Sequence, residues 1–138
     1  MTLSIDRFTR SEWAQWSEKA HLICFQERKP AEWDRIDFAL VVKNEERLLG
    51  YVTCREIDHE TLYWQFGGAF PGTKETALSY KVHLRLIEAC KAHYKRIVFF
   101  VENTNTPMLK MALKSGFRIF GTRFHAGSVL VEHVLEFE

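Results

Sequence analysis

The chain has 138 residues, a length that predicts one domain over residues 1–138. Hydrophobic residues make up 46% and charged residues 27%, and these proportions exclude a disordered or low-complexity chain. Lysine plus arginine number 19 and aspartate plus glutamate number 18, which leaves a formal net charge of +1. This balance gives no general attraction to nucleic acid or to an anionic membrane, so we expect neither as a partner.

The cysteines and the N-terminal segment indicate the compartment. Cys24, Cys54 and Cys90 are an odd number and lack metal-ligand spacing, so we expect reduced, buried thiols and no metal site. The first residues lack the basic and apolar runs of a signal peptide, and apolar runs such as 97–101 are too short to cross a bilayer. We therefore expect a cytoplasmic protein without a membrane partner.

The N-terminal part of the chain predicts a strand followed by helices. Residues 3–8 indicate a short strand, and Thr9 or Ser11 can cap the helix that follows. Pro30 predicts the start of a short second helix that runs through Trp33. Apolar side chains recur at helical spacing along the first helix, at Trp13, Trp16, Ala20 and Ile23. The aromatic excess here belongs either to the core or to an acceptor-site wall or partner surface. Its members are Trp13, Trp16, Phe25 and Trp33.

The central part predicts three strands. Residues 38–42 and 48–57 indicate a hairpin with a turn at 44–46. A third strand over 62–69 contains Gly67 and Gly68. Glycines inside a strand favour a bulge or a close approach of the backbone to a ligand. Packing demands on the strand are the alternative explanation for these two glycines.

A long amphipathic helix is predicted from about 74 to 94, and a strand over 97–101 follows it. The strand is a continuous apolar run, which is typical of strands buried on both faces. The helix carries its apolar residues along one stripe, at Leu78, Val82, Leu86, Ala89 and His93, with Leu84, Ile87 and Cys90 beside it.

The C-terminal part predicts one more helix and two strands. Asn105 has the features of an N-cap, Pro107 lies in the first turn, and Gly116 ends the helix. Strands over 117–124 and 129–137 follow. The whole order is β-α-α-β-β-β-α-β-α-β-β, which predicts an α/β protein with a mixed (α+β) sheet and helices packed on it.

This order resembles the GNAT superfamily of N-acetyltransferases over nearly the whole chain. In that family a strand leads through a loop of pattern Arg/Gln-x-x-Gly-x-Gly/Ala into a helix whose N-terminus cradles the pyrophosphate of acetyl-CoA. Lys74, Ala77 and Ser79 stand at the three motif positions here. An ordinary helix start capped by Thr73 or Thr76 explains the same segment. The resemblance implies that acetyl-CoA is held by the loop residues Lys74, Glu75, Thr76, Ala77 and Ser79.

Residues 105–117 resemble a second family segment, Asn-x-x-Ala-x-x-x-Tyr-x-x-x-Gly-Phe. Asn105, Gly116 and Phe117 match it, and the resemblance implies that Asn105 contacts the pantetheine arm. A capped helix ended by glycine accounts for Asn105 and Gly116 singly, whereas their joint occurrence after an apolar strand favours the family. The family tyrosine that protonates the leaving thiolate corresponds to Ala112, which cannot transfer a proton.

The resemblance also implies where the chemistry takes place. A backbone amide at the end of the 62–69 strand polarises the thioester carbonyl in the family, which makes Gly67 and Gly68 the candidates here. Phe66 and Ala69 flank them as cofactor contacts, and Tyr80 is a candidate hydroxyl for proton transfer.

No general base is evident from the residues. His133 lies on the inward face of the last strand and is either a core residue or a base. His83 and His93 lie on the long helix, where we expect them to be solvated or to pack against it.

Two functions follow from these observations. The first is an acetyl-CoA-dependent N-acetyltransferase that acts on an unknown small-molecule or peptide amine. The second is a GNAT-fold protein without chemistry that serves as a structural or interaction module, since short GNAT-like phage proteins are similar to this chain. The second function implies a virion-associated protein. A homo-oligomer or a protein partner is compatible with either.

Overall fold

The computed structural model describes residues 2–15, 17–25, 35–74 and 76–137. The strands and helices in these segments follow the predicted order. They are β1 (Ser4–Thr9), α1 (Arg10–Ala14), α2 (Ser17–Phe25), β2 (Phe38–Asn44), β3 (Arg47–Glu56), β4 (Thr61–Ala69), α3 (Ala77–Lys91), β5 (Arg96–Glu102), α4 (Thr106–Lys114), β6 (Arg118–His125) and β7 (Ser128–Glu136).

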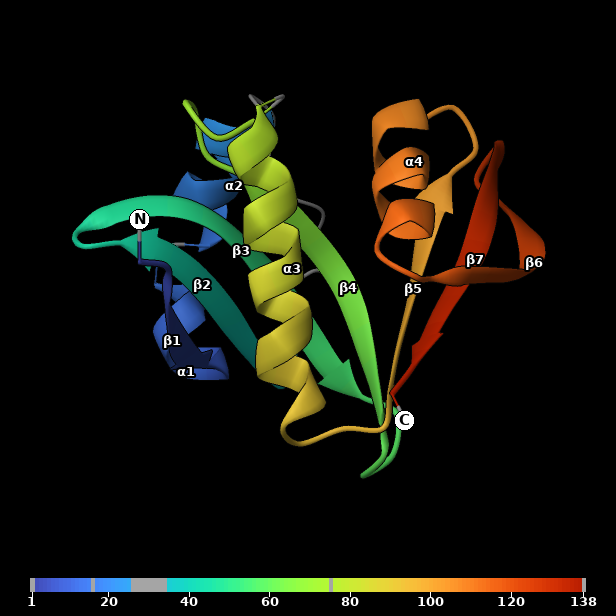
Figure 1. Cartoon of the computed structure of the whole chain (residues 1–138), viewed down its shortest axis with the longest axis horizontal. Helices are drawn as coiled ribbons and strands as arrows, with labels where there is room; N and C mark the ends of the chain where they lie inside the picture. Colours follow the sequence, from blue (N-terminus) through green and yellow to red (C-terminus); the bar gives the residue numbers. More distant parts are fainter. Residues whose placement is uncertain (1, 16, 26–34, 75, 138) are drawn as a thin grey trace.

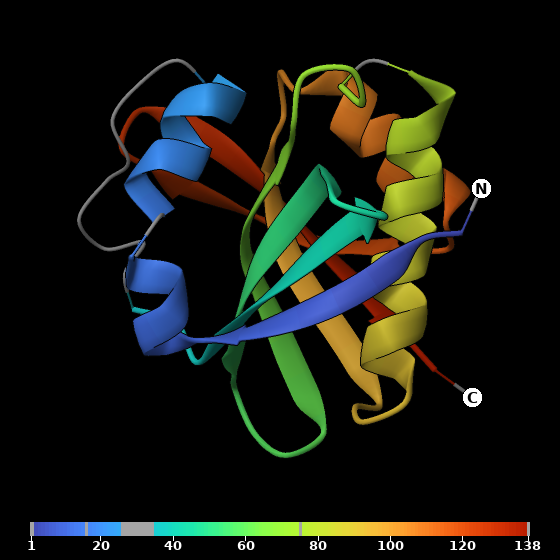
Figure 2. The ribbon, with the colours of Figure 1, turned by 90° about the vertical axis from the view of Figure 1, so that its left-hand side faces the viewer.

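All the strands join one sheet in the order β1-β2-β3-β4-β5-β7-β6. Neighbouring strands are antiparallel except β4 and β5, which run parallel as the β-α-β crossover through α3 predicts. The sheet lies between two pairs of helices, with α1 and α2 on one face and α3 and α4 on the other (Figures 1 and 2). This is the mixed α/β architecture that the sequence predicts.

Each face of the sheet has its own apolar core. The larger core lies under α3 and α4 and includes the buried side chains of Leu49, Leu62, Trp64, Leu86, Ile97, Phe99 and Phe117. The smaller core lies under α1 and α2 and includes those of Trp13, Ala20, Cys24, Val41, Tyr51 and Phe70. Trp13 therefore belongs to the core, which is one of the two roles considered for the N-terminal aromatic residues.

The N-terminal helical region differs from the single helix that the spacing predicts. Thr9 caps α1 in a capping box with Glu12, and α1 ends at Ala14 before α2 begins at Ser17. The buried face of α2 carries Ser17, Ala20, His21 and Cys24, whereas Ile23 is 43% exposed. The prediction that Ile23 continues the apolar face was wrong, because the break after α1 changes which side chains of α2 face the sheet. Trp16 and the predicted helix over 30–33 lie outside the described residues.

Helix α3 is shorter than predicted at both ends. It begins at Ala77 with Thr76 as N-cap, because the Thr76 hydroxyl accepts a hydrogen bond from the Leu78 amide. It ends at Lys91, so His93 and Tyr94 follow the helix. Leu84 is 39% exposed and does not widen the apolar stripe as predicted. None of the helices that the structure describes is long and apolar enough to cross a membrane.

Strand β5 alternates between a buried and a half-buried face, which corrects the prediction of burial on both faces. Ile97, Phe99 and Val101 are buried under α3 and α4, and Val98 and Phe100 on the other face are half-buried. The reason is that α1 and α2 cover the other end of the sheet, over β1 to β4 (Figure 2).

The remaining local predictions are confirmed. The Asn105 side chain caps α4, Pro107 lies in its first turn, and Gly116 follows it with a φ of 101° that suits glycine. The three cysteines are free and buried. Burial raises the pKa of the Cys24 and Cys90 thiols to about 11, so both stay protonated at neutral pH.

Candidate functional site

Strands β4 and β5 are hydrogen-bonded partners over only a short stretch. Their parallel register covers three pairs and ends at Tyr63 and Val98, although β4 continues to Ala69 and β5 to Glu102. Beyond these pairs the two strands diverge toward their C-terminal ends, with α3 beside β4 and α4 beside β5 (Figure 1). The divergence begins directly after Tyr63 and Val98, before β4 reaches Gly67 and Gly68.

A β-bulge in β4 lies at Gln65 and not at the two glycines, which corrects that prediction. Thr53 of β3 pairs with Phe66 and Cys54 pairs with Trp64, so Gln65 is the extra residue. An extra residue shifts the alternation of the strand by one. As a result Trp64 packs in the core under α3 and α4, and Phe66 packs against the core under α1 and α2.

The bulge also sets which backbone groups of β4 face β5. The Phe70 amide donates to the Leu49 carbonyl at 3.0 Å, so the pair Leu49–Phe70 is hydrogen-bonded across β3 and β4. Hydrogen-bonded and non-bonded pairs alternate along an antiparallel ladder. By this alternation Phe66 and Gly68 direct their amides toward β3. Gly67 and Ala69 direct theirs away from β3, toward the divergence from β5.

Packing explains why residue 68 is glycine. A Cβ atom at Gly68 would lie 2.7 Å from Cε1 of Tyr51 and 3.0 Å from Cε2 of Phe25. At Gly67 the nearest atom to such a Cβ is the Tyr51 carbonyl oxygen at 3.3 Å. Gly68 therefore makes room for the aromatic rings below α2, which supports the packing explanation at this position.

In the loop before α3, several side-chain and backbone groups form hydrogen bonds with one another. The Thr76 and Ser79 hydroxyls donate to the carbonyls of Thr73 and Thr76, at 2.6 and 2.7 Å. The Leu78 and Ser79 amides bond to the Thr76 hydroxyl and carbonyl, whereas the Ala77 amide makes no hydrogen bond with a described residue. Ala77 thus presents the available donor at the N-terminus of α3.

Of the predicted loop residues Lys74 and Glu75, the structure describes only Lys74. The Lys74 ammonium donates to the Cys24 carbonyl at 3.4 Å and lies 5.6 Å from the Phe25 ring centroid. Lys74 is thereby tied to the end of α2. Glu75 lies outside the described residues.

Asn105 is exposed at the start of α4, after the end of β5. Its Oδ1 accepts the Met108 amide at 3.3 Å. Its side-chain NH₂ group makes no hydrogen bond with a described residue, so this group can donate to a ligand between β4 and β5.

Side chains of α3 and α4 meet at the level of Tyr80 and His83. His83 Nε2 lies 2.8 Å from the Ser115 hydroxyl, and the Lys114 ammonium lies 4.3 Å from the Tyr80 ring centroid. His83 is 5% exposed, so of the two alternatives considered for it, solvation or packing, the structure shows packing. Burial lowers the His83 pKa to about 4, and the ring is neutral at pH 7.

Two other predicted positions are fully buried. Ala112 has an exposed fraction of 0%, so the position of the family tyrosine is enclosed in the core under α4. His133 faces inward as predicted, stacks on Phe99 and donates from Nδ1 to the Val131 carbonyl at 3.0 Å. Burial lowers the His133 pKa, so a neutral ring is favoured.

The sheet face on the side of α1 and α2 brings Tyr63, which could orient a water, together with Phe100 and Arg123, to which the sequence assigned no role. Tyr63 and Phe100 meet edge to face across β4 and β5, with centroids 5.6 Å apart. Arg123 lies 4.6 Å from the Phe100 ring centroid, and its guanidinium is 3.8 Å from Glu132. The register that joins them depends on the order β4-β5-β7-β6, which no local spacing reveals. Among the described residues, no three His, Cys, Asp or Glu side chains gather as a metal ion would require.

Comparison with known proteins finds no matching protein family and no curated protein with a similar sequence. Solved structures with the same arrangement are numerous. The ribosomal-protein-S18-alanine N-acetyltransferase from Escherichia coli has a TM-score of 0.79 at 7% identity and covers 98% of this chain and 94% of its own. The spermidine/spermine N-acetyltransferase from Vibrio cholerae has a TM-score of 0.74 at 14% identity, with 98% and 95% covered.

A GNAT family acetyltransferase from Elizabethkingia anophelis, solved with acetyl-CoA bound, has a TM-score of 0.73 at 15% identity and covers 98% of both chains. These similarities extend over almost the full length of each protein. The identities of 7–15% are too low to compare single residues, so the similarity concerns the fold alone. The chain has the fold of the GNAT N-acetyltransferases.

Proposed function

We propose that this protein binds acetyl-CoA between β4 and β5 and transfers the acetyl group to a primary amine. The observation that carries the proposal is the early end of β4–β5 pairing at Tyr63 and Val98. It leaves the amides of Gly67 and Ala69 without a strand partner on the β5 side. An extended amide-containing arm, such as pantetheine, can pair with these groups as an additional strand would.

The loop before α3 supports a weaker hold on the diphosphate than a glycine-rich loop would supply. The Ala77 amide and the positive end of the α3 dipole favour an anion. The Thr76 and Ser79 hydroxyls, however, already donate to carbonyls, and Lys74 is bonded to Cys24. We therefore place the diphosphate at Ala77 and the pantetheine arm beside Asn105.

In this proposal acetyl-CoA supplies a thioester, and the chain supplies position and one backbone dipole. The amine nitrogen forms a bond to the acetyl carbon, the C–S bond breaks, and the sulfur leaves as a thiolate. The Gly67 amide faces the divergence and can donate to the carbonyl oxygen as negative charge develops on it. The amine proton passes to solvent, since none of the contacts among the described residues brings a carboxylate or an imidazole to the Gly67 amide.

Turnover is expected to be slow because the usual proton donor is replaced by Ala112. Tyr80 is the substitute hydroxyl among the predicted residues, and the Lys114 ammonium lies over its ring, 4.3 Å from the centroid. Without general acid assistance the rate falls by roughly two to four powers of ten.

Two neighbours of the same fold, which by name acetylate a polyamine and a protein alanine, support an amine as the acceptor. The half-buried rings of Tyr63 and Phe100 support an acceptor with an apolar or cationic segment next to the amine. The test is incubation with acetyl-CoA and either spermidine or a peptide with a free N-terminus. Thiol release and the acetylated mass are measured together.

We expect one of the acceptors to gain an acetyl group with the wild-type protein. Ala77→Asp should raise the KM for acetyl-CoA by about tenfold or more, because it places a carboxylate against the diphosphate. Ala126→Asp, in the exposed turn between β6 and β7, is the matched control and should leave the KM unchanged. Binding of acetyl-CoA without acetylation of either acceptor would contradict the catalytic part of the proposal and favour an interaction module.

A further inference from the structure

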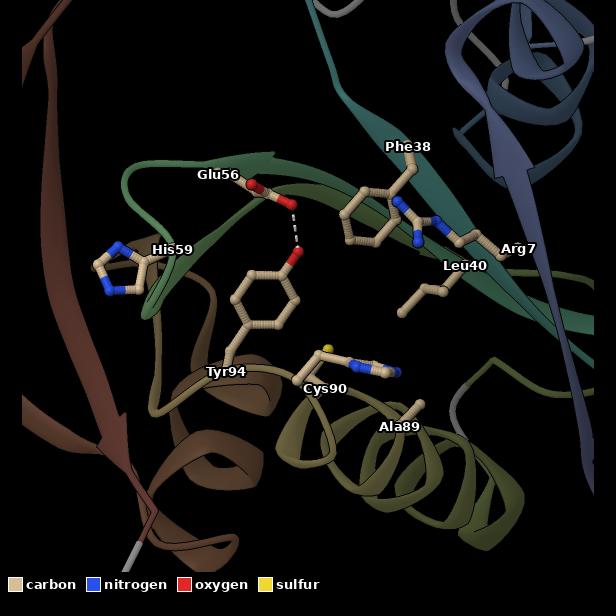
Figure 3. Close-up of a pocket in the computed structure, with 9 residues that line it drawn as sticks. Arg7, Phe38, Leu40, Glu56, His59, Ala89, Cys90 and Tyr94 are labelled. Atoms are coloured by element: carbon tan, nitrogen blue, oxygen red, sulfur yellow. Dashed lines mark hydrogen bonds between the residues drawn. The ribbon is translucent and has the colours of Figure 1, made fainter.

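A hollow lies at the C-terminal end of α3, away from the Thr76 cap. Its volume is about 460 Å³, and it is lined by β1, β2, the end of β3, the β3–β4 turn and the end of α3 (Figure 3). The divergence of β4 and β5 opens toward the N-terminal end of the same helix (Figure 1). The hollow is therefore separate from the acetyl-CoA site proposed above and does not depend on it.

The inner wall of this hollow is apolar. Phe38 and Leu40 come from β2, and Ala89 comes from α3 opposite them (Figure 3). Cys90 lies between them at 2% exposure, with its thiol held protonated by burial. This wall offers contact to a ring or a short aliphatic chain.

The rim carries the positive charge of Arg7, which has no ion-pair partner among the described residues. The Arg7 guanidinium lies 4.2 Å from the Phe38 ring centroid and makes no ion pair or hydrogen bond with a described residue. Stacking uses the face of a guanidinium and leaves its N–H edge available for a carboxylate.

The Glu56 carboxylate at the rim accepts a hydrogen bond from a neighbouring phenol. The Tyr94 hydroxyl donates to Glu56 Oε1 at 2.6 Å (Figure 3). Burial together with this carboxylate raises the Tyr94 pKa, so the phenol remains a donor. The His59 imidazole lies 3.5 Å from Glu60, and His93 completes the rim.

We propose that this hollow is a binding site for a small organic carboxylate with an aromatic or short aliphatic body. The carboxylate meets the guanidinium edge of Arg7, and the body lies against Phe38, Leu40 and Ala89. A cationic ligand is disfavoured by Arg7, and a purely apolar ligand leaves the guanidinium without a partner.

The probe is phenylacetate, with phenylacetamide as its uncharged counterpart of the same shape. Both are titrated into the uniformly ¹⁵N-labelled protein and followed by amide chemical shifts. We expect phenylacetate to shift the amides of Leu40 and Ala89 with a dissociation constant on the order of 1 mM or tighter. Phenylacetamide should bind at least about tenfold more weakly, since it lacks the charge-assisted contact.

Two variants separate charge from shape. Arg7→Met keeps an unbranched side chain and removes the charge, and it should weaken phenylacetate binding by about tenfold or more while leaving phenylacetamide unchanged. Ala89→Phe fills the hollow from α3 and should abolish binding of both probes. Arg123→Met is the matched control, because Arg123 also stacks on a phenylalanine ring but lies on β6.

Equal affinities of the two probes for the wild-type protein, or equal phenylacetate affinities for the wild type and Arg7→Met, would overturn the proposal. So would the absence of shifts at Leu40 and Ala89 when the probe is in large excess. Amide spectra of each variant without probe report its fold, and Ala89→Phe gives an independent answer if Arg7→Met unfolds.

Discussion

At the scale of single residues, His83 shows how burial determines the chemistry of a side chain. The helical spacing places it on α3 but does not reveal that α4 covers it, because Ser115 comes 32 residues later in the chain. Only the packing of α3 beside α4 brings the imidazole to that hydroxyl. The ring is consequently neutral and hydrogen-bonded, although an exposed histidine on a helix would titrate near neutral pH.

The His83 pKa predicts a loss of stability in acid. The folded protein lowers it from 6.5 to about 4, so the unfolded chain binds more protons between these two pH values. The free energy of unfolding therefore falls as pH drops through this window, by about 2 kcal/mol from His83 between pH 7 and pH 5. His133 contributes with the same sign because burial also lowers its pKa.

Urea unfolding at pH 7 and pH 5 measures this effect. His83→Gln removes the titrating group. Between pH 7 and pH 5 the free energy of unfolding of this variant should therefore fall by about 2 kcal/mol less than that of the wild type. His93→Gln, just beyond the end of the same helix at an exposed position, should keep the wild-type loss. An unchanged pH dependence in His83→Gln would show that the ring is not held neutral by burial.

At the scale of elements, the bulge in β4 decides which groups face the proposed site. Sequence reasoning located the strand and its glycines but assigned the bulge to Gly67 and Gly68, because glycine is the usual signal for a bulge. The structure places the extra residue at Gln65, where the register between Thr53 and Cys54 shifts. Such a register depends on both strands of the pair and cannot be found from one of them.

Some of the other elements can be predicted from local sequence features, whereas others depend on tertiary packing. The cap at Asn105, the proline after it and the glycine at residue 116 are local features, and the sequence located α4 from them correctly. The break between α1 and α2 and the half-buried face of β5 depend on which elements cover them. Those two features were predicted incorrectly, since the hydropathy of a segment does not show which other elements pack against it.

The two adjacent glycines of β4 give a matched prediction about packing. Gly68→Ala should lower the free energy of unfolding by about 1–3 kcal/mol, because its Cβ would meet the rings of Tyr51 and Phe25. Gly67→Ala should cost clearly less, since its closest contact is a backbone oxygen at 3.3 Å. Chemical unfolding of both variants in parallel measures the difference. If Gly67→Ala were the more damaging change, our assignment of the side on which each residue packs would be wrong.

At the scale of the whole molecule, the chain combines a GNAT fold with a loop before α3 that lacks the glycines of the family pattern. The sheet order, the crossover through α3 and the divergence of β4 from β5 agree with the order of elements in the sequence. The loop before α3 offers the Ala77 amide where a glycine-rich loop would offer several donors. Acetyl-CoA can bind only if the divergence of β4 and β5 and the Ala77 amide hold it without the further amide donors of a glycine-rich loop.

The most direct test of the central claim is calorimetric titration of the wild-type protein with acetyl-CoA and with CoA. We predict one molecule bound per chain, with a dissociation constant in the micromolar range for acetyl-CoA, corresponding to roughly 6–8 kcal/mol. The backbone of Gly67 and Ala69 would supply the contacts to the arm and Ala77 the contact to the diphosphate. No heat of binding with either ligand at millimolar concentration would contradict the claim that the divergence of β4 and β5 is an acetyl-CoA site.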